Sequence, residues 1–327
     1  MRNCWNPVSK GVPAENRIYN ITYESVGGQR HSDSAYYNIK KRTWYWDEDE
    51  ENEVKRKIIA WSNLPAPYNP PYPIFGAIIG DIVGSIYEFN NIKSKKFQFW
   101  NPKAYFTDDT VMTIAVYDAI SIYKSDPSVD LKSLLVDKMR FYGKKYPHCS
   151  YGMRFNLWLN GDCYGPYNSF GNGAAMRVSA AGYFAESLEE ARQLARTSAA
   201  VTHNHPEGIK GAESVATGIY LALSGESKAV IAEALKEYWD LDFSLNEVRS
   251  DYEFDETCQG TVPHAIVAFL ESENFEDSIR NAISLGGDSD TLAAITGSIA
   301  GAYYGITNDM LEQASSYLDE YLLNKIV

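Results

Sequence analysis

A proline-rich stretch, LPAPYNPPYP at residues 64–73, constrains the possible folds of this chain more than any other feature. Five of its ten residues are proline. Proline fixes φ and has no backbone N–H, so neither a helix nor an internal strand can run through such a segment. It is expected to be a stiff linker. The sequence therefore predicts two separate parts, residues 1–63 and residues 74–327.

The part before the linker is rich in tyrosine, tryptophan and charged residues. It contains three strand-like runs, at 17–26, 35–46 and 57–63. β-Branched and aromatic residues are enriched in strands. An acidic run, DEDEEN at 47–52, is predicted to be a solvated turn. We therefore expect residues 1–63 to form a small β-rich accessory segment.

The part after the linker has helical periodicity. Apolar residues recur at three-and-four spacing, and many of these stretches begin with Ser, Thr, Asp or Asn, which cap helix N-termini. No strong two-residue alternation and no repeat of fixed length is present. An all-α domain of roughly ten helices is predicted. The clearest helical stretches are 110–123, 131–143, 187–201, 210–225, 228–239, 261–272 and 308–323.

Charge and composition limit the possible partners and location. The net charge of −13 argues against a nucleic-acid backbone or an anionic membrane as the main partner. The four cysteines have no metal-like spacing and are expected to be reduced thiols. The N-terminus lacks the apolar run of a signal peptide, and no 18-residue apolar stretch could span a bilayer. A cytoplasmic protein without a membrane partner is the expectation.

Two acidic clusters, 180 residues apart, have the same design. In FTDDT, Thr107 is a predicted N-cap that places Asp108 and Asp109 in the first turn of a helix. In GGDSDT, two glycines precede Asp288, Asp290 and Thr291, and an apolar helix follows. Acids at helix starts are common, so a pair of ordinary caps is one interpretation. The other is a metal site. Carboxylate and hydroxyl oxygens suit Mg²⁺ or Mn²⁺ rather than zinc, and this many acids suggests two ions.

Three further motifs carry polar residues with a possible function. Glu88 follows GDIVGSIY, whose small residues would let this helix approach another closely; alternatively, Glu88 is a solvated terminal glutamate. The N–H groups of Gly171 and Gly173, with Ser169 and Asn172, could hold phosphate oxygens, although GNG is also an ordinary turn.

The THNHPEG motif contains two histidines in an H-x-H pair. No third imidazole or cysteine accompanies them, so a metal site is not favoured. Pro206 is instead expected to start a helix, with His203 facing a pocket or a helix cap.

Five motifs in order resemble the ADP-ribosylglycohydrolase family, which includes dinitrogenase reductase-activating glycohydrolase. They are GAIIGDIVGSIYE, FTDDT, FGNGAAMR, THNHPEG and GGDSDT, and the resemblance covers residues 74 to about 305. It implies a compact all-α domain with two divalent cations, Mg²⁺ or Mn²⁺, at the base of a cleft. The implied metal ligands are Thr107, Asp108, Asp109, Asp288, Asp290 and Thr291.

The resemblance also implies roles around the metals. Glu88 matches a glutamate that handles water or protonates the leaving group. Ser169, Phe170 and Asn172 match a loop that holds a diphosphate, and His203 matches a residue lining the ADP-ribose site. The predicted catalytic residues are Glu88 and Asp109, while the choice of general base stays open between Glu88 and the aspartate pairs.

The predicted activity is metal-dependent hydrolysis of the glycosidic bond between ADP-ribose and a modified acceptor. The acceptor stays open among arginine, serine, a nucleobase and a small O-acyl group, so a nucleic acid is an expected partner only if ADP-ribosylated. A monomer is the expected state. The alternatives are a non-catalytic ADP-ribose-binding or structural protein on the same scaffold, and a different binuclear hydrolase such as a phosphatase.

Overall fold

The computed structural model describes residues 6–8, 11–14, 17–24, 30–46, 50–63 and 71–326. The chain divides into two compact units, Met1–Asn69 and Pro70–Val327. Most of the predicted linker, residues 64–70, lies outside the described residues, as do residues 47–49 of the acidic run. The last residues of the predicted linker already belong to the helical unit, because Pro71 is the N-cap of its first helix.

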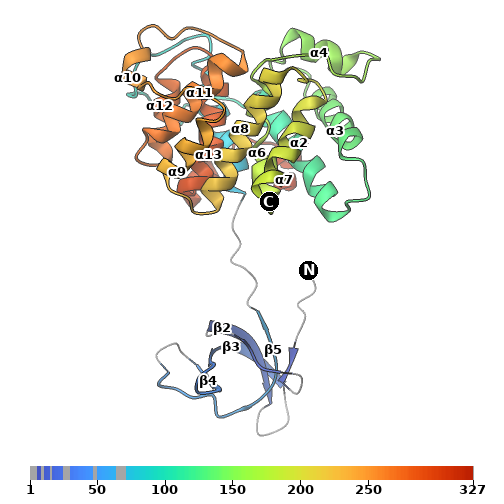
Figure 1. Cartoon of the computed structure of the whole chain (residues 1–327), viewed down its shortest axis with the longest axis vertical. Helices are drawn as coiled ribbons and strands as arrows, with labels where there is room; N and C mark the ends of the chain where they lie inside the picture. The colour runs from blue at the N-terminus through green and yellow to red at the C-terminus, as the bar shows by residue number, and fades with distance from the viewer. Residues whose placement is uncertain are drawn as a thin grey trace. The chain divides into compact units, whose positions relative to one another are not determined.

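The first unit contains an antiparallel sheet with the strand order β1-β5-β2-β3-β4 (Figure 1). Its buried core includes Tyr19 and Ile21 of one strand and Tyr37 of the next, with Trp44 packed edge-on against Tyr19. This alternate spacing is what a strand with one buried face requires. The strands are β1 (Asn6–Pro7), β2 (Arg17–Glu24), β3 (Arg30–Asn38), β4 (Thr43–Tyr45) and β5 (Lys57–Asn63).

The prediction of one strand over 35–46 was wrong. The chain turns at residues 39–42, where Arg42 has a φ of 53°, and β3 and β4 pair with each other across this turn. The aromatic residues on both sides of the turn gave a continuous strand-like pattern, which hides a turn that contains neither Gly nor Pro.

The second unit is helical, and the predicted fold class is confirmed. Its helices enclose one continuous hydrophobic core, and Figure 1 shows α13 flanked by α8 and α11. The longer helices are α1 (Tyr72–Gly84), α2 (Asp108–Ser125), α3 (Leu131–Lys145), α7 (Leu188–Ala200), α8 (Pro206–Leu223), α11 (Cys258–Leu270) and α13 (Ser289–Tyr304). The shorter ones are α4 (Met153–Asn160), α5 (Gly173–Met176), α6 (Ser179–Phe184), α9 (Lys228–Leu235), α10 (Leu245–Val248), α12 (Phe275–Ile283), α14 (Asn308–Ser315) and α15 (Glu320–Ile326).

The described residues contain more helices than the ten predicted, because several are too short to show a periodicity. α5 and α10 each have four residues. The predicted helix over 308–323 is in fact two helices, α14 and α15. Between them, the Asp319 carboxylate accepts a hydrogen bond from the Leu322 N–H at 2.9 Å, which starts the second helix. Within the described residues, no helix combines the length and apolar character needed to cross a membrane.

α1 and α13 cross at unusually close range, and this crossing builds the base of the candidate site. A Cβ added to Gly80 would lie 2.1 Å from the Ala293 carbonyl oxygen, and one added to Gly84 would lie 2.5 Å from the Asp290 Cα. Side chains at either position are therefore sterically impossible without separating the helices. The predicted close approach of this helix through Gly80 and Gly84 is confirmed.

Substituting Gly84 with alanine is expected to lower the free energy of unfolding by about 1–3 kcal/mol or more, because the new methyl group overpacks the α1–α13 contact. Denaturant unfolding of the full chain measures this. Gly165→Ala is the matched control, since its Cβ would meet nothing closer than the Cys163 sulfur at 4.0 Å. Equal stability of the two variants would contradict the described contact.

Candidate metal and ligand site

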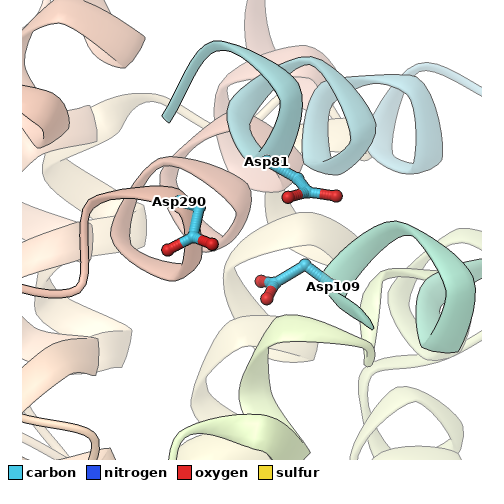
Figure 2. Close-up of side chains that lie close together, drawn as sticks. All are labelled: Asp81, Asp109 and Asp290. Atoms are coloured by element: carbon cyan, nitrogen blue, oxygen red, sulfur yellow. The ribbon is translucent and has the colours of Figure 1, made fainter. Parts of the chain in front are cut away.

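Carboxylates from three helices converge beside the α1–α13 crossing. Figure 2 shows Asp81 of α1, Asp109 of α2 and Asp290 of α13 with their side chains directed toward one another. One carboxylate oxygen from each lies within 4.8 Å of the others. Asp290 also belongs to a second such group, with Glu88 and Asp288. Asp290 is thus common to two adjacent groups of acids.

The α2 end of the site is organised by a capped helix start and by Asp81. Thr107 is the N-cap, as predicted, and its Oγ1 accepts a hydrogen bond from the Asp109 N–H at 3.3 Å. Asp81 in turn accepts hydrogen bonds from the Thr107 N–H, the Thr107 Oγ1–H and the Thr110 N–H, at 2.9, 2.7 and 3.0 Å. Both oxygens of Asp81 are therefore already occupied, which makes Asp81 a residue that positions the FTDDT turn. Because Thr107 donates its only hydroxyl proton, its oxygen lone pairs are left to accept from Asp109 or to meet a cation.

The α13 end is organised by a glycine turn and by Asn91. Gly286 and Gly287 have φ values of 71° and 68°, a left-handed conformation that favours glycine. Asn91 accepts a hydrogen bond from the Gly287 N–H at 2.8 Å and its amide nitrogen lies 2.9 Å from the Gly287 oxygen. The same amide nitrogen is 2.8 Å from the Glu88 carbonyl oxygen. Asn91 therefore ties the loop carrying Glu88, which follows the end of α1, to the turn carrying Asp288.

Burial raises the pKa values of the acids in the site, and neighbouring carboxylates add to the shift for most of them. Burial raises the pKa of Asp81 to about 6, and burial together with the charges of Asp288 and Asp81 raises the pKa of Glu88 to about 7. Burial and neighbouring carboxylates raise the pKa values of Asp108, Asp109 and Asp290 well above the ordinary value, and burial also raises that of Asp288.

A buried carboxylate oxygen of Asp109 indicates that a cation fits the site. Asp109 Oδ2 accepts a hydrogen bond from Thr291 Oγ1 at 3.1 Å, whereas Oδ1 is buried and has no hydrogen-bond partner in the described part of the chain. An orphaned carboxylate oxygen among other carboxylates is costly unless a cation meets it. The donor set consists only of oxygen, which suits a hard divalent cation. The residues present therefore fit such an ion.

These pKa shifts predict a pH-dependent stabilisation by metal. A carboxyl group whose pKa is raised by folding keeps its proton when the unfolded chain has lost it, so metal-free stability falls as the pH rises from about 4 toward about 7. A bound cation replaces those protons and removes the loss. The increase in melting temperature caused by Mn²⁺ should therefore be larger at pH 7.5 than at pH 5. An increase that is equal at both pH values would contradict the clustering of these acids.

A cavity of about 260 Å³ opens above the acids. Asp108 and Asp288, from the two distant motifs, both line it. Its lining includes Glu88 and the other acids as well as Arg154, Arg177 and His203. The predicted site residues that line the cavity are Glu88, Asp108, Asp109, Ser169, Gly171, Asn172, Gly173, His203, Asp288, Asp290 and Thr291.

Two predicted residues do not line the cavity. Thr107 is buried and hydrogen-bonded to Asp81. Phe170 is 41% exposed, and its ring lies 5.2 Å from that of His205. Sequence reasoning in turn missed Asp81 as a member of the acid cluster and Arg177 as a lining residue. A signal existed for both, because each is a charged residue inside a stretch of small or apolar residues (GAIIGDIVG and GNGAAMRVSAA). Tyr167, Arg154 and Glu256 also line the cavity, and no sequence pattern around them indicated it.

The FGNG loop is not a simple open phosphate cradle, because some of its polar groups already form hydrogen bonds within the protein. The Gly171 N–H donates to Ser169 Oγ at 3.2 Å. The Asn172 amide nitrogen donates to Asp288 Oδ2 at 2.6 Å and to Thr261 Oγ1 at 3.0 Å. Asn172 therefore holds one of the acids in place and connects the loop to the GGDSDT turn.

In the THNHPEG motif, Pro206 is the first residue of α8, as predicted. His205 caps this helix, since its Nδ1 accepts a hydrogen bond from the Glu207 N–H at 3.2 Å. His203 is buried and lines the cavity. Among the described residues, neither histidine belongs to a group that could hold a metal ion.

The helical unit is similar to known proteins over most of its length. The profile of the ADP-ribosylglycohydrolase family matches residues 74–320. The human ADP-ribosylhydrolase ARH3 is 28% identical over 308 residues, covering 71% of this chain and 84% of its own length. The ADP-ribosylarginine hydrolase Tri1 of Pseudomonas putida (strain GB-1) is 27% identical over 271 residues, covering 72% of this chain and 70% of its own.

A solved structure described as an ADP-ribosylglycohydrolase-related protein complex superposes with a TM-score of 0.54. It has 26% sequence identity, and the match covers 79% of this chain and 98% of that one. The family profile spans most of the helical unit, including every motif that contributes to the cavity. The chain belongs to the ADP-ribosylglycohydrolase family.

Proposed function

We propose that this protein hydrolyses the glycosidic bond between ADP-ribose and a modified acceptor, with residues 74–327 as the catalytic domain and residues 1–63 as an accessory segment. The observation that carries the proposal is the meeting of two acid groups and the FGNG loop in one cavity. The relatives ARH3 and Tri1 are named as hydrolases of ADP-ribosylated substrates, which supports the reaction class.

In this proposal, two divalent cations, Mg²⁺ or Mn²⁺, are held by Asp108, Asp109, Asp288 and Asp290, with hydroxyl oxygens from Thr107 and Thr291. When bound, such ions supply Lewis-acid stabilisation of oxygen ligands and neutralise the clustered carboxylates. Thr291 and Asn172 orient Asp109 and Asp288 through their hydrogen bonds. Asp81 orients the turn that carries Thr107.

The proposed reaction breaks the bond from the anomeric carbon of the distal ribose to the acceptor and forms a bond from that carbon to a water oxygen. The transition state resembles an oxocarbenium ion, which the surrounding carboxylates stabilise. One proton of the water is transferred to the departing acceptor. Glu88 is suited to hold or move this proton, because its pKa of about 7 lets it exchange protons near neutral pH. Asp109 is the other group proposed to take part.

The cavity lining carries groups of both charges, which would orient the ligand. The acids suit the ribose hydroxyls and cations. Arg154, Arg177, His203 and the FGNG loop suit the diphosphate, despite the net charge of −13 of the whole chain.

A turnover assay tests the proposal. The full chain is incubated with Mg²⁺ or Mn²⁺ and a panel of substrates ADP-ribosylated on arginine, serine or a nucleic acid, with and without a chelator. Release of free ADP-ribose that the chelator prevents is the expected result. Release of AMP or phosphate would indicate a phosphohydrolase instead. Binding of ADP-ribose without turnover of any substrate would indicate a non-catalytic protein.

A further inference from the structure

A buried hydrogen-bond chain leads from Arg177 through Thr202 to His203. Arg177 Nη2 donates to Thr202 Oγ1 at 2.7 Å, and Thr202 Oγ1 lies 2.7 Å from His203 Nδ1. All three residues are buried, with His203 at 4% exposure. Arg177 and His203 also line the cavity. This series of hydrogen bonds therefore connects the buried guanidinium group of Arg177 to the ring of His203, which lines the cavity.

The Thr202 hydroxyl group can donate its hydrogen bond to only one of its two partners. A guanidinium group only donates hydrogen bonds, so the Thr202 oxygen must accept from Arg177. The only other hydrogen bond that Thr202 Oγ1 forms among the described residues is the one with His203 Nδ1. If Nδ1 carried a proton, the buried Thr202 hydroxyl would have no acceptor, which is unfavourable. Thr202 therefore donates to an unprotonated Nδ1.

The other ring nitrogen faces the FGNG loop. A Cβ added to Gly173 would lie 3.4 Å from His203 Nε2, and one added to Gly171 would lie 3.6 Å away. Nε2 forms no hydrogen bond within the described residues. The backbone around His203 is fixed by close packing, because a Cβ on Gly208 would lie 2.8 Å from the Ser169 carbonyl oxygen and 3.0 Å from the His203 Cβ.

We propose that Arg177 and Thr202 hold His203 as the neutral tautomer protonated on Nε2, so that His203 donates this N–H to a phosphate-type oxygen lodged against the FGNG loop. Arg177 and Thr202 are positioning residues, and His203 is the binding group. The identity of the ligand as ADP-ribose rests on the proposed function; the tautomer does not.

The electrostatic environment is consistent with a neutral ring. Burial, followed by the charges of Arg177 and Arg154, lowers the pKa of His203 well below its ordinary value. Burial lowers the pKa of Arg177 to about 10, which still leaves it charged at neutral pH. A neutral donor at this position would bind an oxygen acceptor without requiring the histidine to take up a proton.

The tautomer is measured directly in the full chain labelled with ¹⁵N-histidine. Long-range ¹H–¹⁵N correlation spectra at pH 7 report the protonation of each ring nitrogen, and His203→Gln assigns the signal. The expected result is a protonated Nε2 and an unprotonated Nδ1 for His203, without substrate or metal. A proton on Nδ1, or on both nitrogens, would overturn the proposal. Because no turnover is involved, this outcome is independent of the proposed activity.

A binding experiment tests the positioning role. Calorimetry with ADP-ribose is expected to show about tenfold weaker binding for Thr202→Val, which loses the hydroxyl, and a change of less than about twofold for Thr202→Ser, which keeps it. Circular dichroism confirms that both variants are folded. Equal affinities of the folded Val and Ser variants for ADP-ribose would overturn the positioning role of Thr202. ADP-ribose that binds normally but is never produced from any substrate would refute the proposed function alone.

Discussion

Replacing Asp290 with asparagine is expected to lower the rate of ADP-ribose release by about 10³-fold or more, since cation-mediated stabilisation of charge is worth several kcal/mol and each 1.36 kcal/mol is tenfold in rate. Asp290 is a proposed ligand and belongs to both carboxylate groups found in the described residues, so its loss is expected to affect both cations. Asparagine keeps the shape of the side chain and can still accept the hydrogen bond that Asp290 Oδ1 receives from the Thr291 N–H. The fold should therefore be retained.

The measurement is initial-rate kinetics with saturating Mn²⁺, together with a thermal unfolding curve of each variant. Asp137→Asn is the matched control, because Asp137 is an exposed acid on α3, away from the cavity lining. The control should have wild-type kinetics. An Asp290→Asn variant that is folded and retains more than about a tenth of wild-type activity would contradict the metal assignment.

Substituting Glu88 with glutamine is expected to lower turnover by about 10²–10⁴-fold, the usual contribution of a positioned proton-transfer group. The proposed metal ligands do not include Glu88, and only one of the two acid groups contains it, so this variant should still bind at least one Mn²⁺. Loss of turnover with retained metal binding would separate proton transfer from cation binding. Glu226→Gln, an exposed glutamate distant from the cavity lining, is the control.

The pH profile gives a second readout for Glu88. Its pKa is raised to about 7 by burial and by Asp288 and Asp81, and bound cations would favour the carboxylate and move this value downward. The plot of wild-type turnover rate against pH should therefore contain a titration step with its midpoint at or below about pH 7, and the plot for Glu88→Gln should lack that step. The same titration step in the variant would exclude Glu88 as the titrating group.

Local sequence signals predicted the parts of the structure that are determined locally. Thr107 caps α2 and Pro206 starts α8 because N-cap and N1 preferences act within one helical turn. Gly80 and Gly84 marked a close helix crossing, since only small residues allow two backbones to approach. Resemblance to a family then identified which of these local features share a cavity.

Features that depend on tertiary contacts were not predictable in the same way. Asp81 stood out as a charged residue in an apolar stretch, but its role depends on hydrogen bonds to a turn 26 residues later in the sequence. Asn91 joins Glu88 to Gly287 across 196 residues, and no pattern near Asn91 indicates this. The hydrogen bond that the Asn172 side chain donates to Asp288 likewise depends on a partner 116 residues away in the sequence.

We propose that acids from distant parts of the chain form one site for a pair of divalent cations. Titration of metal-stripped full chain with Mn²⁺, with free Mn²⁺ quantified by its electron paramagnetic resonance signal, measures this directly. We expect saturable binding of about two ions per wild-type chain, reduced to one or none in Asp290→Asn. Absence of saturable binding, or identical isotherms for the wild type and the variant, would contradict it.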